Sequence, residues 1–94
     1  MKLSKLFDNF ELLKRLLVDR AECKDNEIVI YDPPFEIRIL KTERMIVISE
    51  NGEDVAILGE GFSEVKDGLE DYIDEWLTAL TSLGFKRYLP RRKF

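Results

Sequence analysis

Acidic side chains gathered in one segment are the residues of this sequence best able to do chemistry. Residues 50 to 75 hold ten carboxylates against a single base, Lys66. The carboxylates are Glu50, Glu53, Asp54, Glu60, Glu64, Asp67, Glu70, Asp71, Asp74 and Glu75. Such a block can attract Arg and Lys on a partner protein, imitate the charge of a nucleic-acid backbone, or form a solvated surface. A Mg²⁺ or Ca²⁺ site is the weakest reading, because one exposed helix face does not supply converging oxygen ligands.

A second charged segment, residues 86 to 94, ends the chain and is basic. Cations alternate there with aromatic residues, a composition suited to phosphate contact and base stacking. The nucleic-acid-binding candidates are Lys86, Arg87, Tyr88, Arg91, Arg92 and Lys93. The same segment could instead contact the acidic helix of its own chain, another protein or a membrane surface.

The remaining composition excludes several kinds of site. The chain has no histidine and one cysteine, Cys23. Ser-His-Asp triads, Cys-His dyads and Cys2His2 zinc sites are therefore excluded. We expect no catalytic residues, no metal, no cofactor and no enzymatic activity. The absence of an oxidative cysteine framework favours the cytoplasm, and no apolar run approaches a membrane span.

The pattern of apolar residues predicts the elements that position these charges, within one α+β domain over residues 1 to 94. Helical periodicity covers Leu3 to Val18. Short apolar runs then predict a four-stranded, mainly antiparallel sheet at residues 28–31, 35–40, 45–48 and 55–58. A long amphipathic helix follows from Ser63 to Gly84, and residues 85–89 suit a short terminal strand.

Asn51-Gly52 predicts a two-residue hairpin turn between the third and fourth strands. This turn sets Ile48 opposite Val55 and Ile46 opposite Ile57. One face of the sheet is then aliphatic, and we expect both helices to cover it. In the alternative arrangement the two helices sandwich the sheet, and the first helix buries the opposite face. The opposite face carries Glu36, Arg38, Leu40, Met45, Val47, Ser49, Asp54, Ala56 and Leu58, and is either solvated or a binding surface.

The long helix is predicted to separate an apolar face from an acidic ridge. Trp76 lies at the centre of the apolar face and should pack on the sheet. The ridge carries Glu64, Asp67, Asp71, Asp74 and Glu75. On the first helix, Leu12 and Leu16 lie outside the main apolar face, so they are either covered within the domain or form a contact for a partner or a second copy in a homodimer.

The strand sequences Glu36-Ile37-Arg38-Ile39 and Val47-Ile48-Ser49-Glu50, between an N-terminal helix and an acidic C-terminal helix, resemble small phage-encoded anti-CRISPR proteins that inhibit Cas9. The resemblance implies an acidic surface that occupies the PAM-reading site of its target. Carried over by position, the residues implied are Glu50, Glu53, Asp54, Asp67, Asp71 and Asp74. The basic end departs from that pattern.

These observations lead to one functional hypothesis and one alternative. The hypothesis is a non-enzymatic inhibitor or interaction module, encoded by a mobile element, that binds a basic, nucleic-acid-binding protein surface. Its partner-binding residues would be Glu50, Glu53, Asp54, Glu64, Asp67, Asp71, Asp74 and Glu75. The alternative is a nucleic-acid-associated accessory protein that acts through the basic end.

Overall fold

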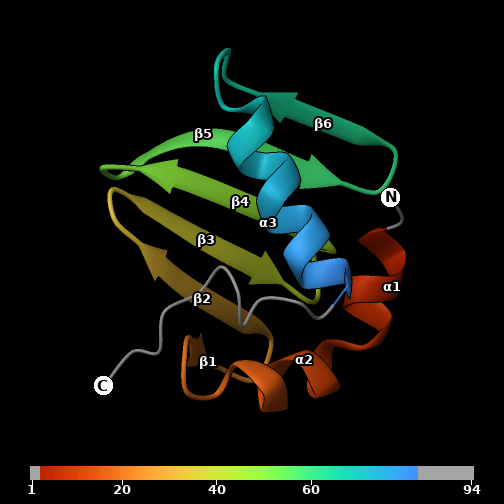
Figure 1. Ribbon diagram of the computed structural model, residues 1–94. Helices are drawn as coiled ribbons and strands as arrows, with labels where there is room; N and C mark the ends of the chain where they lie inside the picture. Colours follow the sequence, from red (N-terminus) through yellow and green to blue (C-terminus); the bar gives the residue numbers. More distant parts are fainter. Residues whose placement is uncertain (1–2, 83–94) are drawn as a thin grey trace.

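The computed structural model describes residues 3–82, which form one antiparallel sheet with helices packed on one of its faces (Figure 1). The six strands lie side by side in the order in which they occur in the chain. The elements are α1 (Leu3–Asp8), α2 (Phe10–Leu17), β1 (Glu22–Cys23), β2 (Glu27–Asp32), β3 (Phe35–Leu40), β4 (Met45–Glu50), β5 (Glu53–Gly59), β6 (Phe62–Val65) and α3 (Glu70–Ser82).

The single helix expected over Leu3 to Val18 is divided at Asn9 into α1 and α2. The Asn9 side-chain amide donates a 2.8 Å hydrogen bond to the Lys5 carbonyl. The Asn9 backbone N–H donates to the same oxygen at 3.2 Å. A side chain that competes for a helical carbonyl in this way can bend or interrupt a helix.

The core lies between the three described helices and one face of the sheet. β2, β3 and β4 each contribute two isoleucines, all at most 1% exposed: Ile28, Ile30, Ile37, Ile39, Ile46 and Ile48. Helical residues of the same core are Leu6, Phe7, Phe10, Leu13, Leu17, Ile73, Trp76, Ala79 and Leu80. Trp76 is 5% exposed, so its expected place in the core is confirmed.

The Asn51-Gly52 turn forms as expected, with φ of 53° and 86° at its two residues. The register of the hairpin changes beyond it, because a β-bulge falls between Ile48 and Ser49. Ser49 pairs with Asp54, but Ile48 pairs with Ala56 and not with Val55. The bulge exchanges the predicted faces of β5 past the turn, so Ala56 and Leu58 join the core and Ile57 lies on the other face.

The expectation of a four-stranded sheet and a long C-terminal helix from Ser63 is wrong. Residues 62–65 form β6, which pairs with β5 about a two-residue turn in which Gly61 has φ of +86°. The helix begins only at Glu70, because Gly68 has φ of +92°, which a right-handed helix does not allow. β1 supplies the sixth strand by pairing Glu22 with Val29 and Cys23 with Ile28. The terminal strand predicted at residues 85–89 lies outside the described residues.

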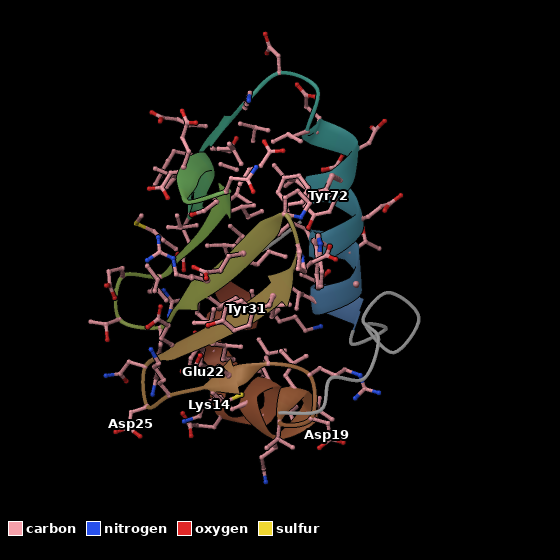
Figure 2. All side chains as sticks on the ribbon, turned by 90° about the vertical axis from the view of Figure 1, so that its left-hand side faces the viewer. Lys14, Asp19, Glu22, Asp25, Tyr31 and Tyr72 are labelled. Carbon is pink, nitrogen blue, oxygen red and sulfur yellow. The ribbon has the colours of Figure 1, made fainter. Side chains whose placement is uncertain are left out.

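Figures 1 and 2 show the helices on one side of the sheet, as the sequence predicts. We call the other side the open face, since within residues 3–82 no helix lies on it. Strand alternation and register place the following residues there: Glu22, Glu27, Val29, Tyr31, Glu36, Arg38, Leu40, Met45, Val47, Ser49, Asp54, Ile57, Phe62 and Glu64.

Candidate functional site

The acidic candidates do not form one helical ridge. Glu64 lies in β6 on the open face, and Asp67 lies in the loop before α3. Only Asp71, Asp74 and Glu75 belong to the helix, where all three are exposed. Glu50, Glu53 and Asp54 flank the Asn51-Gly52 turn. The expected ridge is therefore replaced by two separate acidic groups, one on the hairpin and one at the start of α3.

These two groups nevertheless lie toward the same end of the strands (Figure 1). The Lys66 ammonium lies 3.9 Å from Glu50 Oε1, which joins the loop before α3 to the hairpin. The Tyr72 ring, on the first turn of α3, stacks on Phe35 with a centroid separation of 4.3 Å. Phe35 in turn pairs with Glu50 across β3 and β4. We call the surface formed by Glu50, Glu53, Asp54, Asp67 and Asp71 the acidic end.

Most carboxylates of the acidic end have no base beside them. Among residues 3–82, Glu50 pairs with Lys66 and Asp54 lies 3.7 Å from Arg38 Nη2. Within the same range, Glu53, Asp67 and Asp71 have no ion pair within 4 Å. The acidic end therefore carries an excess of negative charge that the described residues do not neutralise.

At the opposite end of the sheet, bases lie beside several of the carboxylates. Arg44, in the turn between β3 and β4, donates a 2.6 Å hydrogen bond to Glu60 and lies 3.3 Å from Asp8. These partners raise the pKa of Arg44, the bond to Glu60 most of all. Lys41 lies 3.7 Å from Glu11. The unneutralised negative charge described here therefore lies at the acidic end and not at the opposite end of the sheet.

The open face combines an apolar centre with polar groups near the hairpin tip. Val29 and Val47 are nearly fully buried by their neighbours, although they face away from the helices. Arg38 lies between these valines in the register, and its Nε has no hydrogen-bond partner among the described residues. Ser49 donates a 2.8 Å hydrogen bond to Asp54 Oδ1, and Arg38 Nε lies 3.9 Å from Glu36.

Tyr31 borders this polar group, and Figure 2 shows it close to Glu22. The Tyr31 hydroxyl donates a 2.9 Å hydrogen bond to Glu22 Oε2. That bond raises the pKa of Tyr31, because a phenolate beside the carboxylate would be repelled. Tyr31 was not among the residues singled out from the sequence, although its alternation with Ile30 would have placed it on the open face.

Cys23 lies in partly buried surroundings. Its Sγ donates a 3.6 Å hydrogen bond to the Lys14 carbonyl, and burial raises the pKa of the thiol. These surroundings favour the protonated, less nucleophilic form. Within residues 3–82, no group of three or more His, Cys, Asp and Glu side chains is placed to hold a metal ion.

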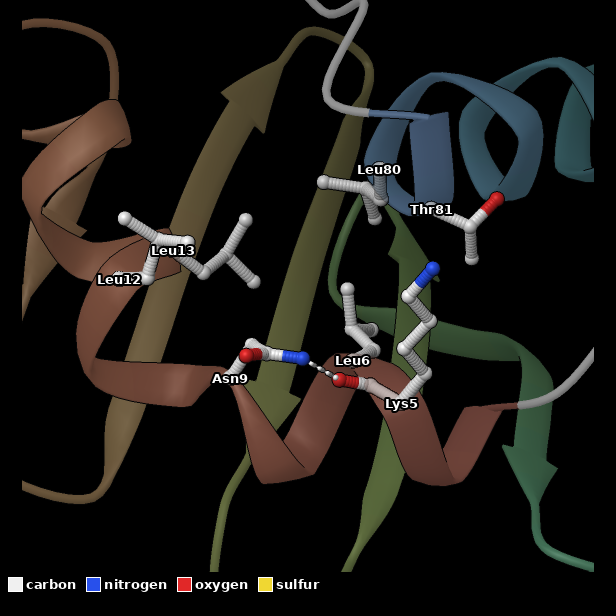
Figure 3. Close-up of a pocket in the computed structure, with 7 residues that line it drawn as sticks. All are labelled: Lys5, Leu6, Asn9, Leu12, Leu13, Leu80 and Thr81. Atoms are coloured by element: carbon white, nitrogen blue, oxygen red, sulfur yellow. Dashed lines mark hydrogen bonds between the residues drawn. The ribbon is translucent and has the colours of Figure 1, made fainter.

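A hollow of about 400 Å³ lies between the α1–α2 corner and the end of α3 (Figure 3). Leu6, Leu13 and Leu80 form its apolar floor, and Lys5 stands at its edge. Its lining also includes Asn9, Leu12 and Thr81.

The other sequence candidates have the following positions. Leu12 and Leu16 on α2 are 38% and 37% exposed, so the described residues leave both partly uncovered, and a homodimer contact there stays a prediction. The basic candidates Lys86, Arg87, Tyr88, Arg91, Arg92 and Lys93 lie outside the described residues. Contact between the basic end and nucleic acid therefore also stays a prediction.

The architecture defines the class: a two-layer α+β protein with an antiparallel meander sheet and one open face. Residues 2–92 match the model of the Archaeoglobi AF1636 family, and the chain belongs to that family. It is 42% identical over 89 residues to an uncharacterized protein of Archaeoglobus fulgidus, with 95% of each chain covered. No solved structure matches the chain. Neither comparison bears on the resemblance to anti-CRISPR proteins, which stays a prediction.

Among the described residues, none of the helices has both the length and the apolar character needed to cross a lipid bilayer.

Proposed function

We propose that this chain is a non-enzymatic protein-interaction module that binds a positively charged protein surface through its acidic end. The observation that carries the proposal is the convergence of two acidic segments, the hairpin tip and the start of α3, through the Lys66–Glu50 ion pair. Asp74 and Glu75 extend the negative surface along the exposed side of α3, and Glu64 extends it onto β6.

Unpaired carboxylates favour a cationic partner for two reasons. They attract Arg and Lys over roughly a Debye length of ~8 Å at physiological salt, which speeds encounter with the correct surface. They also repel phosphate, so they favour a protein over a nucleic acid. A nucleic-acid-binding protein has the required basic surface. The chain would inhibit such a protein by competing with its nucleic acid. The sequence resemblance to anti-CRISPR proteins supports this mode of action.

The proposal places the module in the cytoplasm. A lone, partly buried Cys23 is compatible with a reducing compartment, where structural disulfides are rare.

Affinity capture with variant baits tests the proposal. The full chain and the double reversal Glu53→Lys/Asp71→Lys are immobilised and exposed to extract from the source cells, and bound proteins are quantified by mass spectrometry. The control bait, Asp25→Lys/Glu43→Lys, changes net charge equally at the opposite end of the sheet. A basic protein retained by the wild type and the control but depleted on the acidic-end variant supports the proposal. Equal retention by all three baits contradicts it.

A further inference from the structure

β6 (Phe62–Val65) is the last strand of the sheet and pairs with β5 on one side only. Figure 1 shows it at the margin of the sheet. The Lys66 backbone N–H donates a 2.9 Å hydrogen bond to the Val55 carbonyl. Because the backbone groups of successive residues point in opposite directions across a strand, those of Ser63 and Val65 point away from β5. Among residues 3–82 these outward groups have no hydrogen-bond partner, so β6 can pair with a further strand.

A groove of about 650 Å³ lies beside this unpaired edge, on the helix side of the sheet. The Ser63 and Val65 side chains face it, because Phe62 and Glu64 lie on the open face. Its apolar lining comes from α1, β5, β6 and α3 and consists of Leu3, Leu58, Val65, Ile73 and Leu77. Three of these residues, Leu3, Val65 and Leu77, are partly exposed. An extended segment added to β6 would therefore find apolar surface for the side chains that it places on the helix side.

The groove also contains two carboxylates. Among the described residues that line it, Glu70 and Asp74 alone are charged, and both are exposed. Within residues 3–82 neither has a Lys or Arg nitrogen within 4 Å. Glu70 Oε2 accepts a 3.0 Å hydrogen bond from the Gly68 N–H, which leaves Asp74 as the carboxylate available to a ligand. A cation that enters the groove therefore meets an unneutralised carboxylate.

The geometry disfavours other occupants of this edge. A second copy that pairs Ser63 with Val65 would set Glu64 of one copy opposite Glu64 of the other, and like charges directly opposite destabilise a sheet. Nucleic acid would bring phosphates to Asp74 and cannot continue the backbone ladder. An extended protein segment with apolar and basic side chains meets neither obstacle.

We propose that β6 binds an extended protein segment as an added antiparallel strand. Its backbone bonds to Ser63 and Val65, its apolar side chains enter the groove, and an Arg or Lys side chain reaches Asp74. Main-chain hydrogen bonds supply affinity in this mode of recognition, and side chains that alternate into a groove supply specificity. The inference goes beyond the proposed function, because none of the five residues of the acidic end lines this groove.

The probe is the capped peptide acetyl-Val-Thr-Arg-Thr-Val-Thr-amide, titrated into the isotopically labelled full chain and followed by backbone amide shifts. Strand alternation places both Val side chains and the Arg side chain on one face of the peptide. We expect saturable shifts at Ser63 and Val65 and along the groove side of α3. A matched peptide with Glu in place of Arg should bind more weakly by roughly threefold or more, because Asp74 repels it.

Methylation of the peptide backbone tests the strand pairing itself. In the proposed pairing the Val and Arg N–H groups point toward β6, and the Thr N–H groups point away from it. N-methyl groups on the Arg and the second Val should therefore abolish binding. N-methyl groups on the first two Thr residues should leave binding in place.

Two pairs of variants locate the site on the protein. Ser63→Pro removes an outward N–H and no bond to β5, a change that an edge strand tolerates. It should abolish binding, whereas Ser63→Ala keeps the N–H and should bind like the wild type. Asp74→Asn should weaken the Arg peptide roughly two- to fivefold, because one exposed charge contact is lost. Asp71→Asn, on the same helix but outside the groove, should leave the affinity unchanged.

Several outcomes would overturn the inference. They are no saturable binding of the Arg peptide, equal binding of the two methylated peptides, equal binding by the two Ser63 variants, shifts confined to the acidic end, or a dimer that covers β6 without peptide. If Ser63→Pro does not fold, the methylated peptides decide the question on the wild-type chain. The titration does not involve the captured partner, so its failure leaves the acidic-end proposal standing, and its success does not support that proposal.

Discussion

The Tyr72 hydroxyl donates a 2.7 Å hydrogen bond to Asp32 Oδ2, across forty positions of the chain. The bond joins the first turn of α3 to the end of β2, beside the stacked rings of Tyr72 and Phe35. Asp71 lies on α3, and the hairpin that carries Glu50 pairs with β3 next to β2. The bond therefore fixes the position of the α3 part of the acidic end relative to the hairpin part.

Tyr72→Phe should therefore destabilise the protein by about 1 to 2 kcal/mol, since Asp32 loses a donor in a partly buried place. Asp32→Asn keeps an acceptor oxygen, so it should destabilise the protein less than Tyr72→Phe does. Urea denaturation of both variants measures the difference. An equal cost for the two would show that the hydroxyl bond is not the source of the stabilisation.

The same bond predicts a dependence of stability on alkaline pH. Burial, followed by the bond to Asp32, raises the pKa of Tyr72 above its ordinary value. The folded pKa exceeds the unfolded one, so this contribution is fully present below about pH 10 and is lost as pH rises toward the folded pKa. Stability measured across this range should fall less in Tyr72→Phe than in Tyr31→Phe. The reverse order would contradict the assignment.

Trp76→Ala should destabilise the protein by about 3 to 5 kcal/mol, because the indole is almost fully buried in the core. That is a large share of the ~5 to 15 kcal/mol that stabilises a domain of this size. Far-UV circular dichroism and urea denaturation check the prediction. A native spectrum with an unshifted midpoint would mean that Trp76 does not pack in the core.

Leu12→Ser/Leu16→Ser should cost less than about 1 kcal/mol, since neither side chain is buried by the described residues. Leu13→Ala, at a position 1% exposed, should cost about 2 to 5 kcal/mol. Thermal unfolding measures the loss of stability in each variant.

Sedimentation of the wild type and the double variant also tests a homodimer through α2. The dimer would dissociate in the double variant only if these leucines form its interface.

The sequence was sufficient to predict features that depend on local pattern. Asn51-Gly52 specifies a turn with two positive φ values, and the isoleucine alternation on β3 and β4 specifies which face is buried. Trp76 follows from helical periodicity. The turn that Glu50, Glu53 and Asp54 flank therefore lies where the sequence predicts it.

The wrong predictions concern segments whose local pattern suits either a helix or a strand, so that strand pairing decides the structure. Residues 62–65 have a helix-start pattern, yet β5 offers an unpaired edge and Glu60-Gly61 supplies the turn that returns the chain to it. Gly61 and Gly68 were the residues in the sequence that could have indicated a turn at residue 61 and a helix that begins after residue 68. The bulge at Val55 has no sequence signature of its own, so the exchange of Ile57 and Leu58 between faces could not be foreseen.

The alternative function through the basic end has a direct test. We expect that the full chain does not bind single- or double-stranded probes in a low-salt gel-shift titration, because its net charge is −4 and the acidic end repels phosphate. Retention that disappears in a chain ending at Leu89 would instead favour the nucleic-acid reading.

The affinity of the captured partner, measured by calorimetry at two salt concentrations, tests the central claim most directly. We predict that Glu53→Lys/Asp71→Lys weakens binding at low salt by tenfold or more, roughly 1.4 kcal/mol, and that Asp25→Lys/Glu43→Lys binds like the wild type. Raising the salt should weaken the wild type and narrow the difference, because screening reduces exposed charge attraction. Equal affinity of the wild type and the acidic-end variant at low salt would contradict the claim that the acidic end is the binding surface.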